Sequence, residues 1–116
     1  MKARDAARFQ RETFPHWDQH LFDSMLKFFG VVPDARIRQI SRGQRAGVSL
    51  AMTLATDPEL LVLDDPSMGL DPVARRPLVE GLLAFARRDD RTILVCTHLL
   101  DDVERLADRI AIVSNG

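Results

Sequence analysis

The chain has 116 residues, 46% of them hydrophobic and 28% charged, and its formal net charge is -1 at pH 7. These values are typical of one small globular domain or of part of a larger one, and they exclude disordered and fibrous proteins. The near-neutral charge also gives no basic field for nucleic acid, and the single cysteine, Cys96, excludes an internal disulfide. No apolar run approaches the ~20 residues that span a bilayer, so any link to a membrane would be through a partner.

The first half of the chain favours helices. Residues 1–11 are polar, basic and rich in alanine, which is compatible with a helix or with a frayed end. Residues 18–29 carry apolar side chains at helical spacing after Asp18, a good N-cap, and before Gly30, which favours the end of a helix. Residues 45–56 are apolar on most faces and predict a buried helix, with Ser41 as the cap of its start.

Residues 60–65 carry the strongest signal for a ligand site. The four apolar residues 60–63 predict a short strand buried on both faces, as in a parallel sheet. Asp64 and Asp65 follow at its C-terminal end, where open α/β sheets bind ligands. Two adjacent carboxylates repel each other unless a cation, a donor or a shared proton offsets them, and Mg²⁺ with a nucleotide phosphate is a common offset. The alternative interpretation is an acidic turn in solvent.

The residues after the acidic pair predict two further helices. Asp71, followed by a proline, favours the start of the first of them. Pro77 lies within this helical pattern and predicts a kink, or a first turn that is separate from the main helix. Residues 99–107 predict a short helix with Asp101 and Asp102 in its first turn, where the helix dipole favours acids.

Three short apolar segments predict parallel strands. They are residues 60–63, residues 92–97 and residues 109–113. Strands that alternate with helices indicate a parallel sheet. We therefore expect the three segments to be neighbouring strands, with Asp64 and His98 at the same edge of the sheet.

Four motifs, in chain order, resemble those of the ATP-binding-cassette (ABC) ATPases. Ile40-Ser41-Arg42-Gly43-Gln44 resembles their signature motif, and Leu60-Leu61-Val62-Leu63-Asp64-Asp65-Pro66 resembles their Walker B strand. Ser67-Met68-Gly69-Leu70-Asp71-Pro72 is similar to their D-loop, and Thr97-His98 is similar to the strand end that carries their switch histidine. The chain looks closest to the C-terminal half of the nucleotide-binding domain of bacterial ABC transporters.

The resemblance implies a fold and a division of the chain. The fold would be α/β, a partial three-layer P-loop NTPase-like domain with a parallel sheet, preceded by part of a helical subdomain. Residues 1–39 would be part of that helical subdomain. Residues 40–116 would be the C-terminal half of the ATPase core.

The resemblance also implies roles for individual residues at an ATP site. Asp64 would hold Mg²⁺, and the catalytic residues would be Asp65, which orients or deprotonates the attacking water, and His98, which contacts the terminal phosphate. A helix start would clamp an ATP held by a second subunit, because free N–H groups favour an anion and Gly43 lets backbone approach a phosphate closely. Asp71 would touch the second subunit, and the clamp itself would consist of Ser41, Arg42, Gly43 and Gln44.

The sequence departs from the family pattern in three places. The phosphate loop G-x-x-x-x-G-K-[ST] (Walker A) is absent, because neither Lys2 nor Lys27 follows a glycine and precedes Ser or Thr. Gln10 has no strand context and is no clear counterpart of the family's strand-end glutamine. Asp65 stands where the family usually has Glu. We therefore expect a fragment that lacks Walker A and is inactive alone.

The function implied by the resemblance is that of an ATP-binding and ATP-hydrolysing subunit that powers transport through a membrane partner. The implied partners are a second nucleotide-binding domain, in a homo- or heterodimer, and a transmembrane permease subunit, with no nucleic acid. The implied location is the cytoplasm, peripheral to the inner face of the cell membrane. The alternatives are a non-transport ABC ATPase in DNA repair or translation, a small Mg²⁺-dependent phosphoacceptor domain, and a non-catalytic interaction module.

Overall fold

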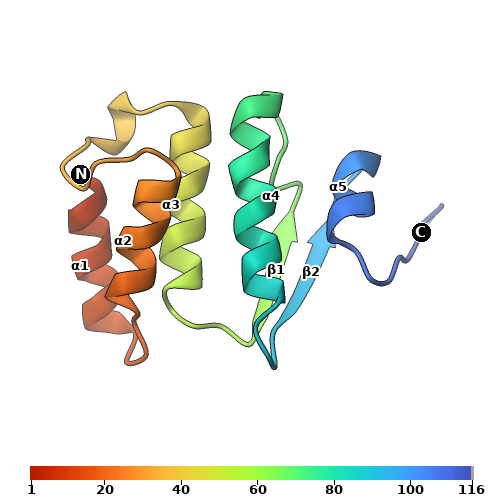
Figure 1. Cartoon of the computed structure of the whole chain (residues 1–116), viewed down its shortest axis with the longest axis horizontal. Coiled ribbons are helices and arrows are strands. Elements are labelled where there is room, and N and C mark those ends of the chain that lie inside the picture. The colour runs from red at the N-terminus through yellow and green to blue at the C-terminus, as the bar shows by residue number, and fades with distance from the viewer. Residues whose placement is uncertain (116) are drawn as a thin grey trace.

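The computed structural model describes residues 1–115, which form helices and a small sheet. Figure 1 shows the helices of the first part of the chain side by side, then a helix that lies against the strands of the sheet, and a short helix beyond them. None of these helices is both long enough and apolar enough to cross a membrane. In chain order the elements are α1 (Ala3–Thr13), α2 (Gln19–Phe28), the 3-10 helix η1 (Ile37–Gln39), α3 (Arg42–Leu54), β1 (Leu60–Asp64), α4 (Pro72–Ala86), β2 (Thr92–Cys96) and α5 (Leu100–Leu106).

Side-chain caps begin three helices at the positions that the sequence predicts. Asp18 Oδ1 accepts a hydrogen bond from the backbone N–H of Leu21 at 2.8 Å, at the start of α2. Ser41 Oγ accepts one from Gln44 N at 3.1 Å before α3, and Asp71 Oδ1 accepts one at 2.8 Å before α4. Each cap satisfies a backbone donor that the first turn of a helix leaves without a partner. The caps therefore fix where α2, α3 and α4 begin.

β1 and β2 are parallel neighbours, as the sequence predicts. Their register runs from Leu60 opposite Thr92 to Asp64 opposite Cys96. The helix α4 connects them, as parallel strands require a crossover connection. Since both strands end at the same end of the sheet, Asp64 and His98 lie at one end as well, which confirms that part of the prediction.

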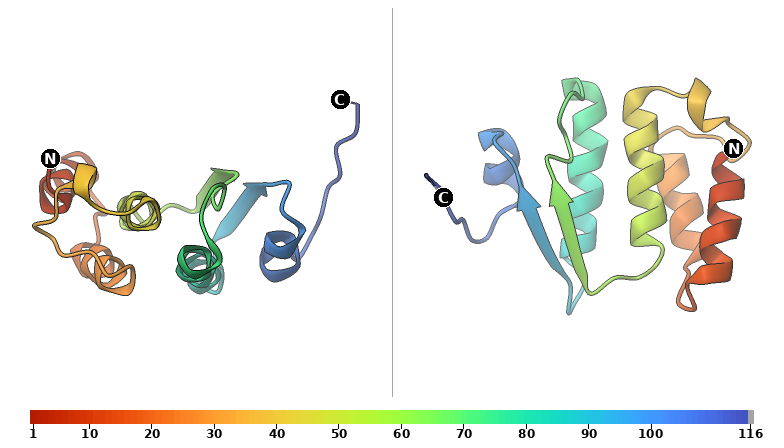
Figure 2. Two further views of the ribbon diagram at one scale, coloured as in Figure 1. Left: turned by 90° about the horizontal axis from the view of Figure 1, so that it is seen from above. Right: turned by 180° about the vertical axis from the view of Figure 1, so that it is seen from behind.

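The predicted third strand at residues 109–113 is wrong. These residues form no strand, and among residues 1–115 the sheet consists of β1 and β2. Ile112 is 90% exposed, and Figures 1 and 2 show this part of the chain leading away from α5 and the sheet. An extended segment becomes a strand only where a neighbouring strand satisfies its backbone hydrogen bonds, and an apolar pattern does not supply that neighbour.

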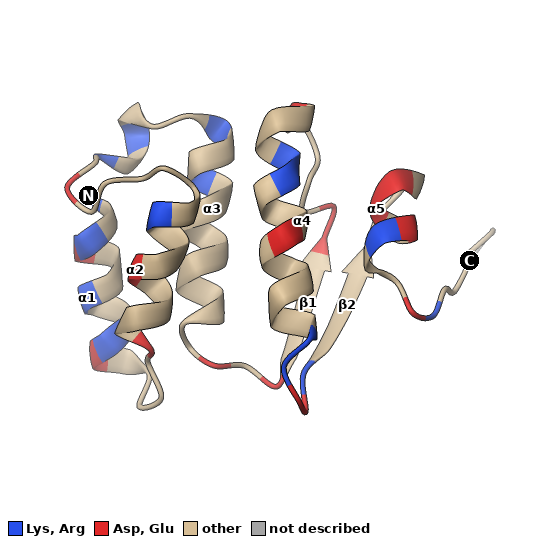
Figure 3. Cartoon of the chain, in the orientation of Figure 1, with Lys and Arg blue, Asp and Glu red and all other residues tan. Residues whose placement is uncertain are grey.

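The sheet is covered on one face only, so the prediction of strands buried on both faces is wrong. Leu61 belongs to the hydrophobic core, whereas Leu60, Val62 and Leu94 are each more than half exposed. Figure 2 shows α4 on one side of the two strands and no described element over the other side. Figure 3 shows that the strands carry no charged side chain before the end of β1. The two strands therefore present an apolar face to solvent.

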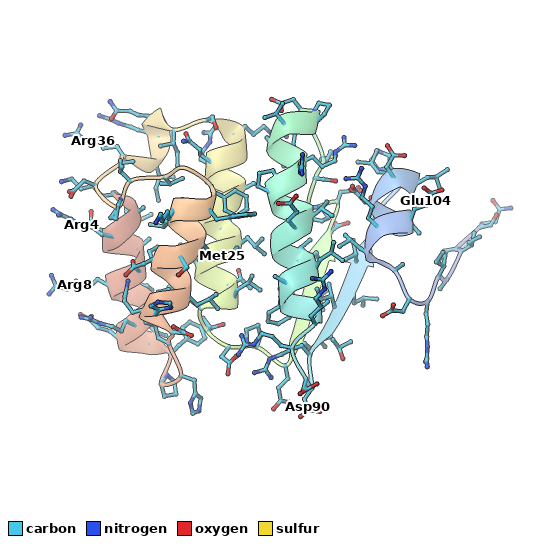
Figure 4. All side chains as sticks on the ribbon, in the orientation of Figure 1. Arg4, Arg8, Met25, Arg36, Asp90 and Glu104 are labelled. Atoms are coloured by element: carbon cyan, nitrogen blue, oxygen red, sulfur yellow. The ribbon has the colours of Figure 1, made fainter. Side chains whose placement is uncertain are left out.

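The helix α4 is continuous, so the predicted separate first turn is absent. Pro77 lies inside the helix and removes one backbone hydrogen bond near its N-terminal end, while the buried face further along packs into the core. Met25 reaches α4 from α2, and a Cβ on Gly81 would lie 3.2 Å from its Cε (Figure 4). The core therefore joins α4 to the preceding helices, and its largest fully buried apolar side chains are Phe22, Leu26, Leu54, Val79 and Leu82.

Candidate functional site

The residues that the sequence assigns to a site lie toward one end of the molecule, in two groups, one at the strand ends and one at the helix starts. Both strands point toward this end, and α3 and α4 begin there, at the top of Figure 1. The arrangement follows from the topology, because a helix that connects parallel strands runs back against their direction and the next strand returns to the same end. The acids at the strand ends and the signature residues at a helix start therefore share this end.

Asp65 and His98 are in direct contact. His98 Nδ1 lies 3.0 Å from Asp65 Oδ1, where a ring N–H donates to the carboxylate. Asp65 adopts a left-handed backbone conformation with φ of 42°, and its own N–H donates to the Cys96 carbonyl at 2.8 Å. This bond ties the residue after β1 to the end of β2. The carboxylate of Asp65, 29% exposed, can therefore orient the more exposed imidazole and still reach solvent.

Asp64 is exposed at the last position of β1. Within residues 1–115 no group of three or more His, Cys, Asp or Glu side chains is arranged to hold a metal ion. Mg²⁺ commonly binds proteins through one or two carboxylates, with waters and substrate phosphates as its other ligands. Asp64 therefore fits a Mg²⁺ site only if waters and a bound phosphate supply most of the ligands.

Ser41 and Gln44 form a capping box at the start of α3. Gln44 N donates to Ser41 Oγ at 3.1 Å, and Ser41 N donates to Gln44 Oε1 at 3.0 Å. The Gln44 amide also donates to the Gly30 carbonyl at 2.8 Å, so this side chain is engaged on both sides. The Ser41 hydroxyl accepts within the box and keeps its own proton for another acceptor. The backbone N–H groups of Arg42 and Gly43 complete the donors of this first turn.

A groove of about 500 Å³ brings the signature segment and Asp71 together. Gly43 has a packing role beside this groove, because a Cβ on it would lie 2.6 Å from the Cβ of Ala74 in α4. The small residue thus permits the close approach of α3 and α4, in addition to the close approach of a phosphate that the sequence suggests. The groove is lined by Phe28, Phe29, Ser41, Gly43, Gln44, Asp71, Val73, Ala74 and Pro77.

Sequence reasoning missed a buried polar pair next to the site. Ser67 is 1% exposed and Asp102 is 2% exposed, and the Ser67 hydroxyl donates a hydrogen bond to Asp102 Oδ2. We expected Asp102 only as one of two acids in the first turn of a helix, where the helix dipole favours acids. The available signal is its spacing of four from Leu106, which is partly buried against the core, because residues four apart share one helix face.

A second missed contact joins the signature segment to the loop after β1. Gly69 has a φ of 69°, and a Cβ built on it would lie 2.6 Å from the Cζ of Arg42. A side chain at position 69 would therefore be strained by the backbone conformation, and it would displace the flexible end of Arg42. Arg42 reaches this loop across the space between two helix starts, so the signature segment and the loop are in contact.

An α/β fold with acids at the ends of parallel strands and helix N-termini at the same end defines a class of phosphate- and nucleotide-binding domains. The family model described as ABC transporter matches residues 3–68, from α1 into the loop after β1. The chain belongs to the ABC transporter family.

Individual relatives agree with this assignment. The chain is 38% identical over 100 residues to the Nod factor export ATP-binding protein I of Neorhizobium galegae, a match that covers 84% of this chain and 28% of that protein. It is 41% identical over 83 residues to the protein of the same name from Burkholderia orbicola, covering 72% of this chain and 27% of that protein. The chain thus spans about a quarter of the length of the curated relatives it matches.

Solved ABC structures share the fold. The cbiO1 protein of Clostridium perfringens, part of the ABC transporter complex cbiONQ, is 30% identical with a TM-score of 0.63, over 78% of this chain and 37% of that chain. An ATP-binding cassette in a dimeric post-hydrolysis state, bound to ADP and Pi, is 25% identical with a TM-score of 0.60, over 71% of this chain and 37% of that chain. The predicted α/β class with a P-loop NTPase fold is therefore confirmed, with two parallel strands in the described chain.

Proposed function

We propose that this chain is part of an ATP-binding and ATP-hydrolysing subunit that powers transport through a membrane permease. The observation that carries the proposal is the contact of Asp65 with His98 at the strand ends, with the start of α3 at the same end of the molecule. Family membership and relatives that bear the name of an export ATP-binding protein support it. The subunit would lie in the cytoplasm, peripheral to the inner face of the membrane through its permease.

The residues at the strand ends would take the hydrolytic roles. Asp64 would hold Mg²⁺, which neutralises charge on the nucleotide phosphates. Asp65 would orient or deprotonate the attacking water, and its contact with His98 would hold the imidazole toward the terminal phosphate. The left-handed conformation of Asp65 supports this role, because it places the carboxylate beside the end of β2.

The start of α3 would act as a clamp on a nucleotide held by a second subunit. Ser41 has a free hydroxyl proton, and the first-turn N–H groups of Arg42 and Gly43 favour an anion. Asp71 lies on the same groove and would face the second subunit. The post-hydrolysis structure of a related cassette is a dimer, which supports a paired nucleotide-binding domain as the partner.

We also propose that residues 1–39 are part of a helical subdomain and residues 40–116 are part of the ATPase core. The 116 residues contain no phosphate loop, and nucleotide affinity in the arrangement we propose depends on one. By itself the chain would then bind Mg²⁺-ATP weakly at most. A segment that carries the phosphate loop must be supplied for activity.

A fusion protein tests this function. The phosphate-loop segment of a curated relative is joined in front of the chain, and phosphate release is measured with and without Mg²⁺. We expect Mg²⁺-dependent hydrolysis that is lost on substitution of alanine for the supplied loop lysine or on Asp64→Asn. A folded fusion that binds ATP but releases no phosphate above the alanine variant would contradict the hydrolytic function and favour a non-catalytic module.

A further inference from the structure

We propose that Asp102 is a positioning residue, which through Ser67 fixes the loop of residues 66–71 relative to the segment that carries His98. The inference rests on the proposed function, because this loop would present Asp71 to the second subunit. The contact itself is the buried hydrogen bond from the Ser67 hydroxyl to Asp102 Oδ2. It joins residues 35 positions apart in the sequence.

The loop of residues 66–71 is internally ordered around Ser67. Met68 N donates to the Asp65 carbonyl at 3.0 Å, and Leu70 N donates to the Ser67 carbonyl at 3.1 Å. Ser67 and Leu70 are buried, while Met68 and Asp71 face solvent. The loop is therefore a pair of tight turns whose interior anchor is Ser67, so that a shift of Ser67 shifts the backbone on both sides.

His98 and Asp102 belong to one short, internally bonded segment. Leu99 N donates to Thr97 Oγ1 at 3.1 Å, and Asp102 N donates to the Leu99 carbonyl at 3.1 Å. Two side-chain contacts join this segment to the strand end and loop. Asp65 meets His98 at the surface, and Ser67 meets Asp102 in the interior. Two contacts prevent the rotation that a single contact would permit, so the two segments move together.

The chemistry of the buried pair argues for positioning rather than for stability. Asp102 Oδ1 is buried and has no hydrogen-bond partner among residues 1–115. Burial of a carboxylate that is not fully hydrogen-bonded is unfavourable, and apolar residues of similar shape often hold two elements together as well or better. The hydrogen bond is directional instead, so it holds the loop at Ser67 in one position relative to α5. Arg42 contacts the same loop at Gly69, so the position of the loop is also linked to the signature segment.

Amide hydrogen exchange on the full chain, followed by NMR, tests the inference without nucleotide. The reporters are the amides of Met68 and Leu70, with the α3 amides of Leu50 and Ala51 as references for global opening. The decisive variant combines Ser67→Ala with Asp102→Leu, which replaces the pair by apolar side chains, leucine having the same branching as aspartate. We expect exchange at both reporters to accelerate by about tenfold or more, as loss of a hydrogen bond to a charged group allows. Exchange at the α3 amides should not accelerate to the same degree, and the melting temperature should not fall correspondingly.

Two further variants separate the hydrogen bond from other effects. Asp102→Asn keeps an acceptor for the Ser67 hydroxyl and should leave reporter exchange close to that of the unmodified chain. Asp101→Leu, at the exposed neighbouring position of α5, is the matched control and should leave it unchanged. The inference is overturned if the double variant accelerates exchange at Met68 and Leu70 no more than at the α3 amides. It is also overturned if these reporter amides are unprotected from exchange in the unmodified chain. Because no nucleotide is used, this result is independent of whether the fusion hydrolyses ATP.

Discussion

Asp65 combines two unusual features for one residue, a left-handed backbone and a carboxylate in contact with an imidazole. Both place the acid where the ends of β1 and β2 meet. An aspartate carboxylate is one methylene closer to the backbone than that of the glutamate usual in the family. The contact with His98 at 3.0 Å shows that the shorter side chain reaches the histidine.

Asp65→Glu should raise turnover in the fusion that carries a phosphate loop. The present carboxylate would sit on the order of 1 Å from the productive position, and such a misplacement can slow a reaction by about 10²-fold. Steady-state phosphate release for the two proteins at saturating Mg²⁺-ATP measures the effect. Asp65→Asn, which keeps the side-chain size and removes the base, is the matched control. Slower turnover with glutamate would show that the aspartate is already in place.

Some residue roles were predictable from the sequence and others were not. The caps Asp18, Ser41 and Asp71 act on a backbone N–H three positions away, so short-range pattern is sufficient to predict them. The pair of Ser67 and Asp102 depends on how α5 docks on the loop. An acid in the first turn of a helix is stable in solvent as well, so this position alone does not predict burial, and the spacing of four from Leu106 is the signal that indicates the buried face.

At the scale of elements, the packing of α3 on α4 depends on a residue without a side chain. Gly43→Ala should lower the melting temperature, although alanine is normally favoured over glycine in helices. The new Cβ would lie 2.6 Å from that of Ala74, and relief of such overpacking costs about 1–3 kcal/mol. Ser49→Ala, at an exposed position of the same helix, is the matched control for propensity. Thermal melting of both variants is followed by circular dichroism at low protein concentration. A gain in stability for Gly43→Ala would contradict the close contact.

An ion pair joins the start of α1 to the segment before η1. Asp34 accepts from Lys2 Nζ at 2.8 Å, and this hydrogen bond, with the nearby charges of Arg4 and Lys2, lowers the pKa of Asp34 below its ordinary 3.8 despite the opposing effect of desolvation. Figure 4 shows Arg4 on the outer side of α1. Since the folded pKa is lowered, the stabilisation is present above pH 3.8 and is lost as pH falls through the folded pKa.

Asp34→Asn should therefore reduce the acid sensitivity of the chain below about pH 4. The measurement is the melting temperature of the variant and of the unmodified chain between pH 5 and pH 3, in steps, at low salt. Asp89→Asn, at another exposed acid, is the control. The two curves should converge at the acidic limit, because protonated aspartate and asparagine both lack the charge. Parallel curves over the whole range would show that the ion pair does not form in solution.

At the scale of the whole molecule, the sheet has one covered face and one apolar face in solvent. Whether a strand is buried on two faces depends on elements from elsewhere, which explains why residues 60–63 were predicted to be buried on both sides. The same reasoning explains residues 109–113, whose apolar pattern meets no neighbouring strand. An apolar pattern shows that a segment can be buried in a sheet. Whether a neighbouring strand or a covering helix is present depends on the rest of the molecule.

The exposed sheet face should make the purified chain associate with itself. Contiguous apolar surface and unpaired strand edges favour association, and Leu94 lies on this face with 55% of its surface exposed. Sedimentation velocity over a range of concentrations should reveal species larger than the monomer. Leu94→Lys should shift the distribution toward monomer, whereas Phe9→Lys, at an exposed apolar position of α1, should not. A monodisperse monomer with a sharp cooperative melt at all concentrations would contradict the prediction.

We propose that this end of the molecule holds part of an ATPase site, and the 116 residues contain no phosphate loop. Phosphate release from Mg²⁺-ATP by the unmodified chain tests it most directly, with the Asp65→Asn variant measured beside it. We expect no release above the buffer rate for either protein, because nothing in the sequence matches a phosphate loop. Robust hydrolysis by the unmodified chain that disappears in Asp65→Asn would contradict this proposal, since these 116 residues would then suffice for catalysis.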